Sequence, residues 1–316
     1  MRLFHYTKTE LAKLAHQQNF IRDTLEKVIR LADVLNYINN NPIMRSRLVL
    51  KGGTAINLTV FPMPRLSVDI DLDYSSNETR EEMLIHRAQI TEELDLYMQT
   101  QGYLLSPQSK RRHSLDSFVF TYQNLGSMRD NIKVEINYSL RSHLFLPTER
   151  PILSDMIRTD SPILDLHPIE LFAAKINALL SRAAARDLYD TYNMISFRLF
   201  PPEELALLRK SVVFYTAISQ EEIPAYYNMN SLDQITLRKI RTDLLPVIQK
   251  GEFINLTQMK ETVKEYLSQL MQLTPNEREF LTAFANKVYL PEQLFDDTRI
   301  VERIQNHPMA LWKTMR

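Results

Sequence analysis

The first 45 residues carry apolar side chains at helical spacing. Thr7 or Thr9 can cap a short helix that contains Leu11 and Leu14. From residue 22 to residue 38, apolar residues recur every three or four positions, which is typical of an amphipathic helix. They are Leu25, Val28, Ile29, Leu31, Ala32, Leu35 and Ile38. We therefore expect residues 1–45 to form helices that pack on the core that follows.

Strand-like patterns dominate from residue 46 to about residue 140. Segments 47–51, 102–106, 117–122 and 131–138 are continuously apolar or alternate, and helices are expected at 54–59 and from Glu78 to Gln101. Pro201 and Pro202 mark a boundary, beyond which nearly everything reads as helical, with prolines as breaks. The sequence predicts an α+β fold with a mixed sheet core and helices over 46–200 and a helical C-terminal domain over 201–316.

Composition narrows the class of protein only slightly. Apolar residues make up 44% of the 316 residues, enough for a sizeable core. No apolar run reaches the roughly 18 residues of a membrane span, and no secretory signal begins the chain, so we expect a cytoplasmic protein without membrane contact. The chain has no cysteine, which excludes disulfides and a cysteine nucleophile. Its 38 basic and 38 acidic residues cancel, so any contact with nucleic acid must be local.

Three aspartates at every second position occupy one side of a predicted strand. Because strand side chains alternate between faces, Asp69, Asp71 and Asp73 point one way, and Ile70 and Leu72 point the other. Like charges in a row repel and weaken a strand unless something positive lies among them. A hard divalent cation with oxygen ligands would meet that need. The alternative is a solvated edge strand that uses acids against aggregation.

A glycine turn precedes this acidic strand. The apolar strand over 47–51 runs directly into Gly52 and Gly53, two of only five glycines in the chain. Glycine accepts positive φ and lets a ligand approach the backbone, and Thr54 then opens a helix. Strand, turn and helix start form an arrangement that commonly binds phosphate, although an ordinary tight turn remains the alternative. With the acids that follow, the turn favours metal-dependent nucleotidyl transfer.

A second strand supplies a further acid. Over 131–138, apolar residues take every second position, and Lys133, Glu135 and Asn137 share the opposite face. If the apolar face packs on helices, Glu135 can lie beside Asp69 and Asp71, where it could bind metal or act as a general base. An exposed Lys–Glu pair on a sheet face is the alternative.

A lysine interrupts an apolar helical stretch further along the chain. Lys175 must either reach solvent or meet an anion, and Arg182 follows on nearly the same helix face. In an unbroken helix Asp187 would lie about 18 Å further along and about 120° around, so both could not reach one nucleotide. The run from Ala183 to Ala185 favours such continuity by helix propensity.

Together these segments resemble a known enzyme family. The Gly-Gly-Thr turn, the Arg-Leu-Ser-Val-Asp-Ile-Asp-Leu segment, the strand over 131–138 and the lysine helix followed by an Arg-Asp-x-x-Asp segment occur in the expected order. They are similar to the motifs of the AbiEii/AbiGii toxin family, the enzyme half of type IV toxin–antitoxin and abortive-infection pairs. That family lies within the polymerase-beta-like nucleotidyltransferase superfamily, so the resemblance implies a nucleotidyltransferase-like mixed sheet core.

The resemblance also implies roles for individual residues. Mg²⁺ would be bound by Asp69, Asp71 and Glu135, although the family often has Asp where this chain has Glu135. Lys175 would contact the triphosphate, and a turn before Asp187 would let that residue join the catalytic set. The catalytic residues implied by the resemblance are Asp69, Asp71, Glu135, Lys175 and Asp187. The nucleotide-binding residues that it implies are Gly52, Gly53, Thr54, Arg65, Ser67 and Lys175. Arg65 could instead pair with an acid, and Ser67 could be an ordinary strand hydroxyl.

The densest basic cluster offers a surface for RNA. Lys110, Arg111 and Arg112 lie between predicted strands, and affinity for a phosphate backbone comes from such charges. A solvated loop is the alternative.

Three hypotheses about function follow. The first is an Mg²⁺-dependent toxin that transfers NMP from an NTP to an RNA acceptor, the 3′ end of tRNA, and is countered by a cognate AbiEi-like antitoxin. The second keeps the chemistry and transfers NMP to a protein or small molecule. The third is a non-catalytic binding protein on the same fold, which the intact spacing of the acids and the lysine disfavours.

Overall fold

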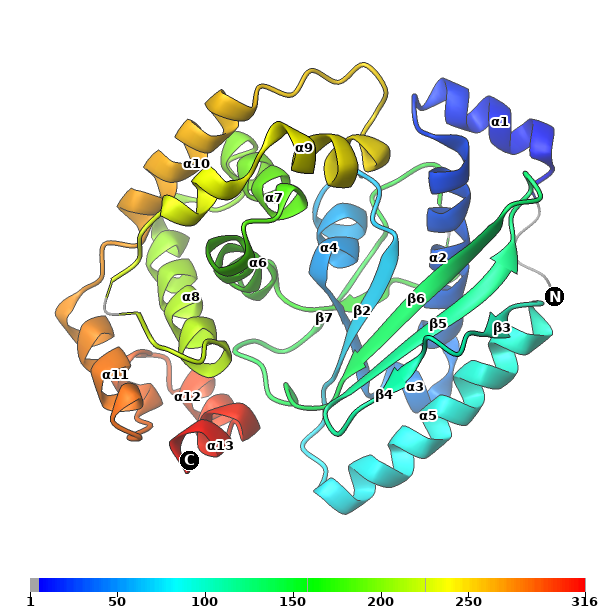
Figure 1. The fold of residues 1–316 in the computed structure, drawn as a ribbon. Helices are drawn as coiled ribbons and strands as arrows, with labels where there is room; N and C mark the ends of the chain where they lie inside the picture. The colour runs from blue at the N-terminus through cyan, green and yellow to red at the C-terminus, as the bar shows by residue number, and fades with distance from the viewer. Residues whose placement is uncertain (1–5, 158, 225, 316) are drawn as a thin grey trace. The chain divides into compact units, whose positions relative to one another are not determined.

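The computed structural model describes residues 6–157, 159–224 and 226–315 (Figure 1). The chain forms two compact units. The first contains the chain up to Arg141 together with residues 147–166 and 246–252, and the second contains residues 142–146, 167–245 and the chain from Phe253 onward. The chain therefore passes between the two units near residues 141 and 167. The sequence predicts domain boundaries after residues 45 and 200.

A mixed sheet forms the first unit, as the sequence predicts. The described strands lie in the order β3 (Leu104–Leu105), β5 (Leu115–Gln123), β6 (Arg129–Asn137), β2 (Asp69–Tyr74), β1 (Leu48–Lys51), β8 (Ile163–Asp165) and β7 (Thr148–Arg150), and β4 (Lys110–Arg111) pairs with β5. Strands β2 and β6 are parallel, as are β1 and β8, whereas the other neighbours run antiparallel.

The helices of this unit form where the sequence predicts them. Thr7 caps α1 (Lys8–Gln17), and Thr79 caps α5 (Arg80–Thr100) through a capping box in which the side chain of residue N3 returns the hydrogen bond. Between them come α2 (Arg22–Asn40) and the short α3 (Pro42–Arg45). Tyr37 of α2 stacks on Tyr97 of α5 with ring centroids 3.8 Å apart, so the two long helices pack together.

Alternation along β2 and β6 separates an apolar face of the sheet from a polar one. Ile70, Ile132, Val134 and Ile136 are all fully buried. Helix α2 contacts both strands and runs behind β6 in Figure 1. Asp69, Asp71, Lys133 and Glu135 point the other way, and each keeps part of its surface exposed. Burial of one face thus fixes which side chains are available for chemistry.

A late segment of the chain completes the first unit. Arg65 forms a β-bridge with Ile248, and the Leu66 amide donates to the Val247 carbonyl at 2.6 Å. The Lys250 amide donates to the Asn19 carbonyl at 2.5 Å. The sequence assigned these residues to the helical C-terminal part, because a contact between positions so distant in the chain leaves no local pattern.

The second unit is helical, as expected. Glu170 is fully buried in the first turn of a helix that begins at Pro168. It accepts hydrogen bonds from the amides of Leu144 and Phe145 and from the Tyr215 hydroxyl, which anchors residues 142–146 within this unit. No helix in the described ranges is long and apolar enough to cross a membrane. The helices are α6 (Pro168–Arg182), α7 (Ala185–Ser196), η2 (Pro202–Glu204), α8 (Leu205–Ser219), η3 (Asn230–Gln234), α9 (Leu237–Lys239), η4 (Ile240–Leu244), η5 (Leu245–Val247, which leads into 246–252), α10 (Leu256–Leu270), α11 (Pro275–Ala285), η6 (Pro291–Gln293), α12 (Thr298–Ile304) and α13 (Pro308–Thr314).

Candidate active site

The glycine turn after β1 packs directly against the acidic strand. Gly52 has a φ of +71°, and a Cβ at this position would lie 2.6 Å from Asp71 Oδ2. A Cβ at Gly53 would lie 2.6 Å from Arg65 Nη2 and 3.1 Å from Ser67 Oγ. Gly52 therefore requires glycine for its backbone conformation, whereas a Cβ at Gly53 would have to displace the end of the buried Arg65 side chain. The helix predicted over 54–59 begins at the glycines themselves, as α4 (Gly52–Ala55), and continues into the π-helical turn η1 (Ile56–Val60).

Buried polar side chains hold this turn to the start of β2. The Thr54 hydroxyl donates to the Asp69 carbonyl and lies 2.9 Å from Ser67 Oγ. Arg65 is only 2% exposed, and its Nη1 donates to the Leu66 carbonyl at 3.0 Å. The structure thus brings Thr54, Arg65 and Ser67 together around Gly53, where they support the turn. Their contact with a nucleotide stays a prediction.

The register of β2 and β6 brings the predicted acids side by side. Asp71 lies directly opposite Glu135, and Asp69 lies opposite Lys133. The Lys133 ammonium is 2.9 Å from Glu135 Oε2. Acids from two neighbouring strands therefore lie side by side, and the Lys133–Glu135 pair that was the alternative for this strand is present as well.

A second lysine neutralises the far end of the acidic row. Lys51, the last residue of β1, forms an ion pair with Asp73, which is 1% exposed. The sequence predicts a positive group among the three aspartates. At Asp73 this group is the Lys51 side chain. Burial nevertheless raises the pKa of Asp73, and Lys51 counteracts this rise.

The electrostatics at Asp71 favour a bound cation. Burial raises the pKa of Asp71, the carboxylates of Asp69 and Glu135 raise it further, and Lys51 and Lys133 oppose them. A carboxylate with a raised pKa beside other acids is stabilised in its charged form by a nearby cation.

The donor set is consistent with magnesium shared with a nucleotide. Mg²⁺ prefers hard oxygen ligands and is usually bound through one or two carboxylates together with substrate phosphates. Asp69 and Asp71 offer such a pair. Within the described ranges no group of three acidic or histidine side chains is arranged to hold a metal ion, so the three-carboxylate site stays a prediction.

A turn between α6 and α7 gathers a second cluster in the helical unit. Ala183 has a φ of +49° and Ala184 is extended, so α6 ends at Arg182 and a new helix starts at Ala185. The turn implied by the family resemblance is confirmed, and the unbroken helix favoured by alanine propensity is wrong. Asp187 consequently lies in the first turn of α7.

This cluster pairs two bases with two acids. Lys175 Nζ is 2.8 Å from Asp187 Oδ1 and 3.0 Å from Asp190 Oδ2, and Arg182 Nε is 2.7 Å from Asp187 Oδ2. Although burial pushes the pKa of Asp187 upward, Lys175 and Arg182 hold it below its usual value. Lys175 therefore meets carboxylates of its own unit, and its contact with a triphosphate stays a prediction.

Asp190 is the member of this cluster that sequence reasoning missed. It is 1% exposed and contacts Lys175 directly. Its position three residues after Asp187 places both carboxylates on one face of a helix. That spacing was available in the Arg-Asp-x-x-Asp segment and could have identified it.

The predicted RNA-binding residues lie on an exposed edge of the sheet. Lys110, Arg111 and Arg112 are all exposed, and the first two form β4. Arg87 donates to the carbonyls of Arg112 and His113 at 2.5 and 2.8 Å, which fixes the backbone beneath the cluster. The basic side chains are accessible, and their contact with RNA stays a prediction.

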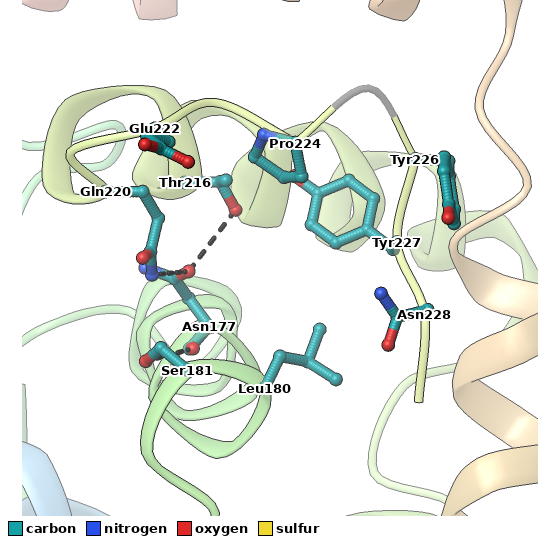
Figure 2. Close-up of a pocket in the computed structure, with 10 residues that line it drawn as sticks. All are labelled: Asn177, Leu180, Ser181, Thr216, Gln220, Glu222, Pro224, Tyr226, Tyr227 and Asn228. Atoms are coloured by element: carbon teal, nitrogen blue, oxygen red, sulfur yellow. Dashed lines mark hydrogen bonds between the residues drawn. The ribbon is translucent and has the colours of Figure 1, made fainter. Parts of the chain in front are cut away.

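A separate cavity of about 190 Å³ lies in the second unit between α6 and α8 (Figure 2). Asn177 accepts hydrogen bonds from Thr216 Oγ1 and Gln220 Nε2 at its wall. Residues that are two positions apart on a helix point about 200° away from each other. Asn177 and Lys175 therefore face nearly opposite sides of α6. The cavity is therefore no extension of the Lys175 cluster, and its lining contains no predicted site residue.

Comparison with known proteins gives a family and a fold. The model of the family described as "Nucleotidyl transferase AbiEii toxin, Type IV TA system" matches residues 34–286. The solved structure of MenT4, a nucleotidyltransferase toxin from Mycobacterium tuberculosis, is similar over 97% of this chain and 99% of its own, with 17% identity and a TM-score of 0.63. The structure of JHP933 from Helicobacter pylori is similar over 84% of this chain and 98% of its own, with 16% identity and a TM-score of 0.49. No curated protein sequence gives a significant match.

The likeness to MenT4 shows that the fold is that of a nucleotidyltransferase toxin. The family model covers well over half of the chain and spans the glycine turn, both acidic strands and the α6–α7 cluster. This chain therefore belongs to the AbiEii family, the nucleotidyltransferase toxins of type IV toxin–antitoxin systems.

Proposed function

We propose that this enzyme transfers NMP from an NTP to the 3′ end of a tRNA in an Mg²⁺-dependent reaction, in the cytoplasm where both substrates occur. The observation that carries the proposal is the pair formed by Asp69 and Asp71 beside the glycine turn. Among the described residues, Asp73 and Glu135 form ion pairs with lysines, whereas Asp69 and Asp71 do not. Two uncompensated carboxylates against a glycine backbone suit a metal-bound triphosphate.

Each group would have a distinct task. Bound Mg²⁺ supplies charge neutralisation for the phosphates that react. Asp69 and Asp71 would hold it, and the Gly52–Gly53 turn would leave room for the phosphates close to the backbone. Lys175 would contribute positive charge toward the triphosphate, and Glu135 or Asp187 would accept the proton of the attacking hydroxyl.

The family implies an antitoxin as a partner. We propose that this partner is AbiEi-like and that Lys110, Arg111 and Arg112 contribute to binding of the RNA acceptor. Their exposed position on β4 supports the second part of this proposal.

A transfer assay tests the proposal directly. Purified protein is incubated with each labelled NTP in turn, bulk tRNA and Mg²⁺, and the expected result is label in RNA. Asp69→Asn and Asp71→Asn should each lower the rate by at least about a hundredfold, since one preorganised electrostatic group commonly contributes that much. Asp130→Asn is the matched control, because Asp130 lies on β6 and pairs with Lys27 outside the acidic row.

The assay also separates the alternatives. Label in protein instead of RNA would support a protein acceptor and contradict the tRNA proposal. Absence of transfer with every NTP, together with absence of nucleotide binding, would support a binding protein on the same fold.

A further inference from the structure

The polar face of β1, β2 and β6 carries a charge that can be counted. In the stretch where β1 and β6 pair with β2, its acids are Asp69, Asp71, Asp73 and Glu135, and its bases are Lys51 and Lys133. Arg129 lies on the same face of β6 but before the first residue that pairs with β2. Four negative and two positive charges leave a net charge of −2. That value matches the charge of a single divalent cation.

The distribution of these charges says where the cation belongs. Lys51 pairs with Asp73 at one end of the face, and Lys133 pairs with Glu135 on the neighbouring strand. The two uncompensated acids, Asp69 and Asp71, occupy consecutive positions on the same face of β2. Neither lysine pairs with them among the described residues, although both lie near enough to affect the pKa of Asp71.

We propose that the Lys133 ammonium takes the place of a second metal ion in this enzyme, so that the acidic face binds one divalent cation, through Asp69 and Asp71, while Glu135 holds Lys133. The proposal rests on the proposed nucleotidyl transfer and refines its metal site. It changes the role of Glu135 from a metal ligand or general base to a positioning residue for the lysine.

The surroundings of Lys133 keep it charged and in position. Burial disfavours its charge, but the hydrogen bond to Glu135 and the carboxylates of Glu135, Asp69 and Asp71 raise the pKa of Lys133 above its usual value. The ion pair is about a third exposed, and an isolated pair of that kind contributes little. Here the ammonium is attracted by three carboxylates at once, and the pairing of β6 with β2 fixes its Cα opposite Asp69.

A metal-binding titration tests the proposal without relying on activity. The full chain, free of nucleotide, is titrated with Mn²⁺, and free Mn²⁺ is followed by electron paramagnetic resonance. Wild type should bind one ion per chain, and Asp69→Asn should lose it. Lys133→Met removes one positive charge, which changes the net charge of the face from −2 to −3, so this variant should bind a second ion or bind the first about tenfold more tightly.

A charge-neutral double variant makes the decisive comparison. Lys133→Met with Glu135→Gln removes one base and one acid, so the net charge of −2 is unchanged. It should bind one Mn²⁺ with an affinity within about threefold of wild type, because ions respond to the net local charge. Thermal unfolding of each variant confirms that it is folded, and Lys133→Gln replaces Lys133→Met if the latter does not fold.

The contrary results are equally definite. Two Mn²⁺ ions in the wild type, or none, would overturn the proposal. So would loss of binding in the double variant, because Glu135 would then be a ligand. Failure of the proposed function looks different: a chain that binds one ion but labels no RNA would keep this inference and lose the tRNA reaction.

Discussion

At Gly52 the Asp71 carboxylate packs so closely against the backbone that a Cβ atom would not fit. The positive φ of this residue turns the chain at the end of β1, and Asp71 fills the position that a side chain would occupy. The turn and the acid therefore constrain each other, and Asp71 keeps its position only while residue 52 is glycine.

Substitution of Gly52 should affect both stability and metal binding. In Gly52→Ala the positive φ costs about 1–2 kcal/mol, and the new Cβ displaces Asp71. Gly251→Ala is the matched control, because Gly251 has a φ of +86° and no atom within 4 Å of an added Cβ. Urea unfolding should show a loss in both variants, and Mn²⁺ affinity should fall only in Gly52→Ala. Unchanged affinity in that variant would contradict the placement of the metal at Asp71.

Sequence alone located most of the candidate residues but not their partners. Alternation along two strands identified Asp69, Asp71 and Glu135 as members of one polar face, because the period of two is a local property. The Lys133–Glu135 pair lies within one strand, and local alternation already offered it as an alternative. The pairing of Lys51 with Asp73, by contrast, depends on strand order and register, which the sequence does not state. The same holds for Asp190, whose partner Lys175 lies on a different helix.

At the scale of elements, the α6–α7 turn is held by a residue in an unfavourable conformation. Ala183 is buried, with a left-handed backbone of φ +49° and ψ +53°. Non-glycine residues adopt this region at a cost, and glycine is the usual residue after a helix end.

Ala183→Gly should therefore stabilise the protein. Relief of the left-handed strain outweighs the greater freedom of glycine in the unfolded chain, with a net gain of about 0.5–1 kcal/mol. Ala184→Gly should have the opposite effect, because Ala184 has an ordinary extended conformation with φ −89°. Denaturant midpoints of the two variants measure the contrast, and a loss of stability in Ala183→Gly would contradict the left-handed turn.

The strand β8 introduces a pH dependence into the first unit. Asp165 is fully buried, accepts a hydrogen bond from Thr59 and lies 3.4 Å from Arg150 Nε. Burial raises the pKa of Asp165 from 3.8 to about 7, against the effects of Thr59 and Arg150. The folded protein thus holds a proton that the unfolded chain releases at lower pH.

The sign of the effect follows from linkage. The stabilisation from protonated Asp165 is complete below about pH 4 and is lost as pH rises to about 7, with an upper limit of about 4 kcal/mol. Asp165→Asn should remove this dependence, so that its unfolding free energy relative to wild type is higher at pH 8 than at pH 5. Urea unfolding at both pH values measures the difference, and an equal difference at both would show that Asp165 does not titrate in this range.

Long elements were predictable and short ones were not. Helices α2 and α5 and strands β5 and β6 carry a period or a cap that a local pattern reveals. Strands β4, β7 and β8 have two or three residues each, too few for any period. The α6–α7 turn contradicts local propensity, and only the family resemblance indicated it.

At the scale of the whole molecule, the balance of charge limits how RNA can bind. With 38 basic and 38 acidic residues, the chain has no overall field to attract a polyanion. Affinity must come from a few local cations, and their number can be measured through salt dependence.

Removal of the exposed cluster on β4 should lower that dependence. If Lys110, Arg111 and Arg112 each contact a phosphate of single-stranded RNA, the triple alanine variant should reduce the slope of log affinity against log salt by about 2. Tm should change little, because all three side chains are exposed. Fluorescence anisotropy with tRNA at several salt concentrations measures the slope, and an unchanged slope would place the RNA elsewhere.

The bridge between Arg65 and Ile248 has a consequence for the order in which the ribosome makes the protein. Residues 246–252 supply the partners of Leu66 and Asn19, yet they are synthesised long after the glycine turn and both acidic strands. A nascent chain that stops before them lacks the strand contact that closes the unit around Arg65 and Ser67. Prematurely terminated translation products of this toxin would therefore carry every acid of the candidate active site without the backbone that completes its surroundings.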